Sequence, residues 1–139
     1  MALCWEGSNE VFIPEIDAEH RILFRMIDEL RRMIKAGGDP AGVKAGIRAL
    51  SSEMDAHFGH EERMMGDSAF WGATWHKRQH GTARKHLRNA SRADEKGDAA
   101  KAEREMTALG SWLNDHTSIA DRILGAFLRN HERSARSHR

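Results

Sequence analysis

Hydrophobic residues recur through most of the chain at steps of three and four positions, the spacing that gathers them on one face of an α-helix. No segment shows the two-residue alternation typical of a β-strand. Glycine, aspartate and proline interrupt the pattern near residues 37–40, 66–68 and 97–98, where they favour the end of one helix and the cap of the next. The sequence therefore predicts an all-α chain with helices at residues 17–36, 40–65, 70–95 and 98–129.

Helices joined by such short turns are expected to form an antiparallel up-down-up-down four-helix bundle, in which each helix buries one hydrophobic seam. The predicted seams are Ile16, His20, Leu23, Ile27, Leu30 and Ile34; Val43, Ile47, Leu50, Met54, His57, Glu61 and Met64; His76, His80, Ala83, Leu87 and Ala90; and Ala102, Met106, Leu109, Leu113, His116, Ala120, Ile123 and Phe127. Histidine or glutamate therefore occupies positions in every seam where packing favours an apolar residue.

The length of 139 residues fits one domain, which we expect to carry a short N-terminal arm at residues 1–16 and a frayed basic tail at about residues 130–139. The formal net charge of +1 gives no electrostatic reason to expect a nucleic acid or an anionic membrane as partner. No apolar run is long enough to cross a bilayer. A single cysteine, Cys4, and the lack of an export leader favour the cytoplasm.

The polar seam residues are predicted to meet in one layer of the bundle. Residues of two antiparallel helices lie at the same level when they are equally far along the chain from the connecting turn, as His20 and His57 are from the turn at 37–40. The same relation holds across the other two turns. The residues brought together in this way are His20, His57, Glu61, His76, His80, His116 and Asp121.

Burying several imidazoles and two carboxylates without compensation costs several kcal/mol each, and a bound cation supplies that compensation. Seven ligands exceed the four of a structural zinc site, so two metal ions are implied. A donor set rich in imidazole suits iron better than manganese or magnesium, and no histidine has the glutamate three residues before it that ferritin-like di-iron bundles use. His116 and Asp121 point roughly 140° apart on an ideal helix, which leaves open a distorted helix or a wide centre with a bridging carboxylate.

These residues carry a family resemblance. The pattern His20, His57-Phe58-x-x-Glu61, His76-Lys77-x-x-His80 and Trp112-Leu113-x-x-His116-x4-Asp121 resembles hemerythrins, in particular the single-domain bacterial members. The resemblance implies that His76, His80 and His116 hold one iron, that His20 and His57 hold the other, and that Glu61 and Asp121 bridge them together with an oxo or hydroxo group. It also implies that dioxygen binds reversibly at the open position of the second iron.

The residues expected around an oxygen pocket are Phe58, Trp112, Leu113, Asn114 and Thr117. Hemerythrins usually have aliphatic residues where Asn114 and Thr117 stand, and often a bulky aromatic residue in place of Ala83. We therefore expect a roomier or wetter pocket and faster autoxidation. Oxygen storage or delivery is favoured over sensing, because the chain has no room for an output domain.

Two other functions compete with oxygen binding. A di-iron oxidase or peroxidase is the main alternative, since Asn114 and Thr117 would bring polar groups to the same centre. A metal-free interaction module is disfavoured by the buried carboxylates. The remaining histidines, His60, His86, His131 and His138, are expected at the surface.

Overall fold

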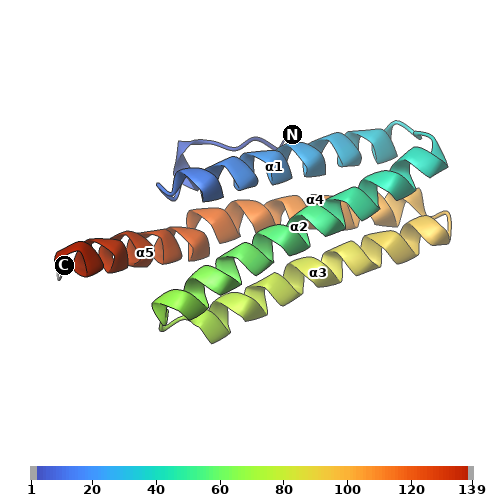
Figure 1. Cartoon of the computed structure of the whole chain (residues 1–139). Coiled ribbons are helices and arrows are strands. Elements are labelled where there is room, and N and C mark those ends of the chain that lie inside the picture. Colours follow the sequence, from blue (N-terminus) through green and yellow to red (C-terminus); the bar gives the residue numbers. More distant parts are fainter. Residues whose placement is uncertain (1–2, 138–139) are drawn as a thin grey trace.

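The structure is a computed structural model that describes residues 3–137, and it confirms the all-α prediction (Figure 1). A short 3-10 turn, η1 (Gly7–Asn9), precedes the helices α1 (Pro14–Lys35), α2 (Pro40–Ser68), α3 (Ala73–Glu95), α4 (Ala99–Ser118) and α5 (Ala120–Ser137). In the bundle, α1 packs against α2 and α4, and α3 packs against the same two helices. No strand occurs among the described residues.

The first helix begins three residues earlier than predicted, so the N-terminal arm is shorter than residues 1–16. Pro14 occupies the first helical position, where its fixed φ suits the helix and its missing N–H costs no hydrogen bond. The second helix begins at Pro40 as predicted, because the Asp39 side chain accepts a hydrogen bond of 3.2 Å from the Gly42 N–H. The third ends at Glu95, also as predicted.

The predicted turn at 66–68 is wrong, because α2 continues to Ser68. Ala69 takes a left-handed conformation with φ 53°, and the Phe70 N–H donates to the Met65 carbonyl at 2.9 Å. Phe70 is buried against Met65 and Leu124. This hydrophobic contact closes the helix end, so the connection occupies residues 69–72 and α3 begins at Ala73 rather than at residue 70.

The predicted continuous helix at 98–129 is interrupted at Ile119, whose φ of −117° departs from the helical value of about −63°. The interruption changes which side chains face the core after it. Ile123, predicted in the seam, is 39% exposed, and Phe127 is only partly buried, whereas Leu124 is buried. The predicted helix end at residue 129 is also wrong, since α5 continues to Ser137, and residues 130–136 of this basic tail are exposed.

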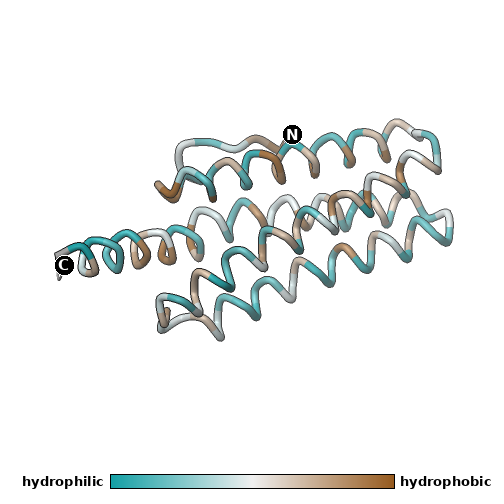
Figure 2. The backbone as a smooth tube through the Cα atoms, viewed as in Figure 1, coloured by the Kyte–Doolittle hydropathy of each residue, from teal (hydrophilic) through white to brown (hydrophobic). Residues whose placement is uncertain are grey.

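The apolar core occupies the part of the bundle beyond the polar layer. Its main cluster includes Leu23, Ile27, Leu50, Met54 and Leu109, each fully buried, and Figure 2 shows the recurrence of hydrophobic residues along each helix. A smaller cluster around Phe70 lies at the other end. The polar layer is therefore enclosed by apolar residues on both sides. None of the described helices combines the length and the apolar character needed to span a membrane.

The N-terminal segment at residues 3–13 is tied to three helices. The Val11 and Phe12 N–H groups donate to the Asp17 carboxylate of α1 at 2.9 and 3.1 Å. Buried Asn9 donates its side-chain amide to the Thr117 hydroxyl of α4 at 2.9 Å, and Arg122 of α5 donates to the Glu10 carbonyl at 3.1 Å. The segment thereby fixes α1 against the junction of α4 and α5.

Candidate metal centre

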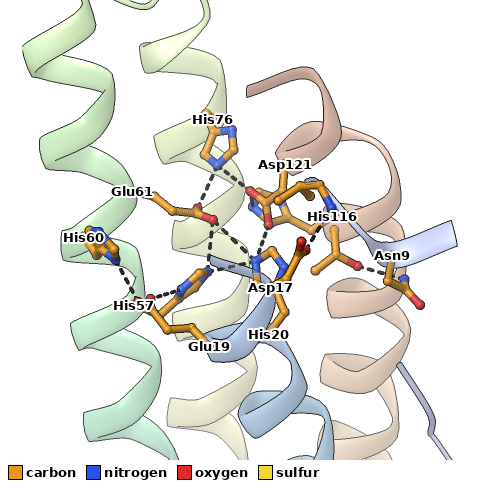
Figure 3. Close-up of polar contacts among 12 residues, drawn as sticks. Asn9, Asp17, Glu19, His20, His57, His60, Glu61, His76, His116 and Asp121 are labelled. Carbon is orange, nitrogen blue, oxygen red and sulfur yellow. Dashed lines mark hydrogen bonds and ion pairs between the residues drawn. The ribbon is translucent and has the colours of Figure 1, made fainter. Parts of the chain in front are cut away.

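The seven predicted residues meet inside the bundle, as Figure 3 shows for most of them. Each is at most 3% exposed. They come from every long helix: His20 from α1, His57 and Glu61 from α2, His76 and His80 from α3, His116 from α4, and Asp121 from α5. The structure therefore brings together all the residues that the seam and turn spacing placed in one layer.

Glu61 divides its two carboxylate oxygens between two groups of histidines. Oε1 lies 3.0 Å from the Nε2 atoms of His76 and His80. Oε2 lies 3.0 Å from His57 Nε2 and 3.5 Å from His20 Nε2. The carboxylate thus faces a three-histidine group with one oxygen and a two-histidine group with the other.

The two carboxylate oxygens of Asp121 also face different histidine groups. Its Oδ1 lies 3.0 Å from His76 Nε2 and 3.1 Å from His116 Nε2, whereas its Oδ2 lies 3.0 Å from His20 Nε2. The interruption at Ile119 makes this possible, because it rotates Asp121 out of the position it would take in a continuous helix. The sequence left open a distorted helix or a wide centre with a bridging carboxylate. The structure has a helix that is distorted at Ile119, and the Asp121 carboxylate also faces both histidine groups.

These separations fit two metal ions of six-fold coordination. Ligand nitrogen and oxygen atoms lie about 2.0–2.2 Å from such ions, so neighbouring ligand atoms at right angles lie about 3 Å apart. The contacts within each group are of that size, including the 3.1 Å between the Nε2 atoms of His20 and His57. The Oε2 atom of Glu61, both carboxylate oxygens of Asp121 and the Nε2 atom of His116 are buried without a hydrogen-bond partner among the described residues, as expected for atoms that bind a cation.

The electrostatics of the layer show how tightly these groups interact. Burial acts to lower the pKa of His57, but the Glu61 charge and a hydrogen bond to Glu19 raise it to about 10. Burial likewise opposes the effect of Asp121 and Glu61 on His76, whose pKa rises to about 9. Burial and the Glu61 charge act to raise the pKa of Asp121, yet His116 and His20 hold this pKa well below the usual range of a carboxyl group. In the metal-free protein His57 and His76 hold protons that a bound cation would replace.

A second set of side chains orients the imidazoles from outside. The Nδ1 atom of His57 lies 2.7 Å from a Glu19 oxygen, that of His80 lies 2.9 Å from a Glu62 oxygen, and that of His116 lies 2.8 Å from the Gln79 amide oxygen. When Nδ1 carries the hydrogen and donates it to these oxygens, Nε2 keeps a free lone pair that points into the layer. This is the tautomer that a metal site requires.

Sequence reasoning missed these three orienting residues. Each stands directly beside a residue of the layer: Glu19 before His20, Glu62 after Glu61, and Gln79 before His80. A side chain one position away is rotated by about 100° around the helix, so it leaves the seam and reaches the neighbouring helix. Their position next to a predicted ligand in the sequence was therefore the signal that could have identified these three residues.

Two aromatic residues predicted near the oxygen pocket do lie against the histidines. The Phe58 ring stacks on His80, with ring centroids 3.9 Å apart, and Trp112 stacks on His116 at 4.4 Å. Leu113 is buried in the main apolar cluster, as is Ala83. These contacts place an apolar wall beside the three-histidine group.

Asn114 was expected around the oxygen pocket, but its side chain contacts the N-terminal segment and not this wall. Asn114 is exposed, and its side-chain oxygen accepts a hydrogen bond of 3.1 Å from Asn9. Thr117 is fully buried, but its hydroxyl accepts from Asn9 and donates to the Asn114 carbonyl at 3.1 Å. Both polar groups therefore hold the N-terminal segment.

The four remaining histidines differ from one another. His60 is only partly exposed, and its Nδ1 atom lies 2.8 Å from the second oxygen of Glu19, so it belongs to the surroundings of the layer. His86 pairs with Glu105 at 2.8 Å, and His131 is exposed beside Phe127. His138 lies outside the described residues.

Comparison with known protein families agrees with this geometry. The family model described as hemerythrin HHE cation binding domain matches residues 11–128, which cover all seven residues of the layer. A comparison with curated proteins found no match.

Proposed function

Because the chain belongs to the hemerythrin family of cation-binding domains, we propose that it binds two iron ions and reversibly binds dioxygen for storage or delivery. The observation that carries this proposal is the division of both carboxylates: Glu61 and Asp121 each turn one oxygen to the three-histidine group and the other to the two-histidine group. Two carboxylates placed in this way suit a pair of ions rather than one.

In this proposal His76, His80 and His116 hold one ion and His20 and His57 the other, with Glu61, Asp121 and an oxo or hydroxo group between them. When bound, an iron pair would supply the electrons that dioxygen takes up on binding and returns on release. The protein supplies unequal nitrogen ligation, three imidazoles against two. An ion held by His20 and His57 would therefore have one protein ligand fewer, which would leave a position for a small molecule.

The surroundings favour release of intact dioxygen over its reduction. Every side chain of the layer is buried, and the Phe58 ring, which stacks on His80, also lies 6.0 Å from the His57 ring of the two-histidine group. Excluding water limits the supply of protons that reductive side reactions consume. An oxidase or peroxidase was supported by the expectation that Asn114 and Thr117 bring polar groups to the centre. Both side chains bind Asn9 instead, so this argument for an enzyme no longer applies.

We also infer that the bundle is antiparallel throughout. Turns of a few residues connect the helices at 36–39, 69–72 and 96–98. His20 and His57, on either side of the first turn, lie at the same level, since their Nε2 atoms are 3.1 Å apart. Such pairing across short turns supports an up-down-up-down order.

The test is anaerobic loading with ferrous iron, followed by metal analysis and by visible spectroscopy during cycles of air and deoxygenation. We expect two iron ions per chain and a charge-transfer band that appears in air and disappears on deoxygenation. His80→Ala should lower the iron content, whereas His86→Ala, a histidine outside the layer, should leave it unchanged. Irreversible bleaching with consumption of peroxide would favour the enzyme, and wild-type protein that retains no iron would refute the proposal.

A further inference from the structure

A groove between α2 and α3 lies on the surface of the bundle, outside the metal layer. Its volume is about 420 Å³, and Ile47 and Leu87 form an apolar floor. Three arginines line it: Arg48 from α2, and Arg84 and Arg88 one helical turn apart on α3. Positive charge therefore gathers around a small hydrophobic surface.

Two of the three arginines, Arg48 and Arg88, have no acidic partner among residues 3–137. Arg84 donates to Asp55 at 3.0 Å, but this is the only acidic residue that lines the groove. Arg48 and Arg88 form no ion pair or hydrogen bond with any residue of the described chain. Because both side chains line one groove, an anion bound there is attracted to both of them.

We propose that this groove binds a phosphorylated organic molecule, with its phosphate on Arg48 and Arg88 and its apolar part on Ile47 and Leu87. The guanidinium group pairs with phosphate through two parallel hydrogen bonds, and the serine hydroxyls that line the groove add further donors. The volume is in the range of small-molecule sites. A macromolecular polyanion is disfavoured by the overall net charge of only +1.

The groove is connected to the metal layer through Arg84. The Arg84 guanidinium lies 5.0 Å from the centre of the Phe58 ring, which stacks on His80. One of its nitrogens also lies 3.9 Å from the Glu62 oxygen that His80 Nδ1 contacts at 2.9 Å. Arg84 already lines the groove, so a phosphate bound there competes with Glu62 for its guanidinium and weakens the contact between Arg84 and Glu62. Glu62 then accepts more strongly from His80, which makes that imidazole a better donor and favours the oxidised centre.

The first experiment measures binding of 1-naphthyl phosphate by calorimetry at low ionic strength, with the protein as purified and its iron content determined. The double variant Arg48→Gln/Arg88→Gln should bind at least about tenfold more weakly. Lys35→Gln/Arg104→Gln loses the same charge at exposed positions away from the groove and should bind like the wild type. Circular dichroism checks that both variants fold. The proposal would be overturned if the two double variants bound 1-naphthyl phosphate equally weakly, or if the wild type did not bind it. Equal affinity of the wild type for 1-naphthol, which lacks the phosphate, would overturn it as well.

The second experiment tests the connection to the layer and rests on the proposed function. In iron-loaded protein, 1-naphthyl phosphate should lower the midpoint potential of the centre, and Arg84→Gln should abolish this shift at ligand concentrations that calorimetry shows to saturate the variant. An unchanged potential with bound ligand would disprove the connection. If the chain retains no iron, the proposed function fails, but the calorimetric titration still decides whether the groove binds phosphate.

Discussion

Replacing Glu19 by glutamine tests whether the side chains around the layer contribute to metal binding. Glu19 is 28% exposed and accepts hydrogen bonds from two histidines, His57 at 2.7 Å and His60 at 2.8 Å. Burial acts to raise its pKa, but the two histidines lower it, so the side chain is charged at neutral pH. Its carboxylate fixes the tautomer of His57 and increases the electron density on Nε2.

The size of the effect follows from the bond that changes. A hydrogen bond to a charged group contributes about 1.5–3 kcal/mol, and a neutral one about 1 kcal/mol. Glutamine keeps an oxygen that accepts from His57 but lacks the charge, so the loss at the metal is about 1–2 kcal/mol. That corresponds to an affinity lower by roughly five- to thirtyfold, which overlaps the range of about 10- to 100-fold known for residues that orient metal ligands.

The assay is anaerobic competition for ferrous iron between the protein and a chromogenic chelator. Glu53→Gln is the matched control, because Glu53 lines the same surface cleft as Glu19 and its replacement removes the same charge without touching an imidazole that faces the layer. We expect weaker binding in Glu19→Gln and wild-type affinity in Glu53→Gln. Equal affinities in the two variants would show that the Glu19 contact has no role in metal binding.

Three further predictions concern stability. Asn9→Leu removes the buried amide that binds Thr117 and should cost about 1–3 kcal/mol of unfolding free energy, measured by chemical denaturation, whereas exposed Ser8→Ala should cost little. In metal-free protein the pKa of His57 is raised to about 10 and that of His76 to about 9, so protonation of both side chains stabilises the fold below about pH 6.5. This stabilisation is lost as the pH rises towards 10. A melting temperature that stays constant between about pH 6.5 and 10 would contradict this prediction. Removing metal should accelerate hydrogen exchange at the α4–α5 junction, residues 117–124, more than at the distal half of α2, and equal acceleration would show that the layer does not hold the junction.

The position of the layer could be predicted from the sequence because two independent patterns agree. Helical spacing placed His20, His57 and Glu61 in the seams, and equal distances from the turns placed them at one level; the structure buries all three. The turns themselves were less predictable. Gly66 and Asp67 are frequent in turns, yet both lie inside α2, since the burial of Phe70 decides where that helix ends.

The surroundings of the layer depend on contacts between helices that a single sequence does not report. The contact between Glu19 and His57 joins residues 38 positions apart, and it depends on how α1 and α2 are rotated about their axes. The role of Asn114 was mispredicted for the same reason, because its partner Asn9 is 105 residues away on a segment with no periodic pattern. Periodicity identifies the buried face of a helix, but not the partner of a side chain at its edge.

The junction at Ile119 explains why the one irregular spacing in the layer is compatible with the site. In a continuous helix His116 and Asp121 point roughly 140° apart, whereas here His116 Nε2 and Asp121 Oδ1 are 3.1 Å apart. The interruption exposes Ile119 and Ile123, which is unfavourable for apolar side chains. The hydrogen bonds from Asn9 and Arg122 that tie the N-terminal segment to this junction offset part of that cost. The segment, which contributes no residue to the layer, therefore helps to hold the carboxylate that faces both histidine groups.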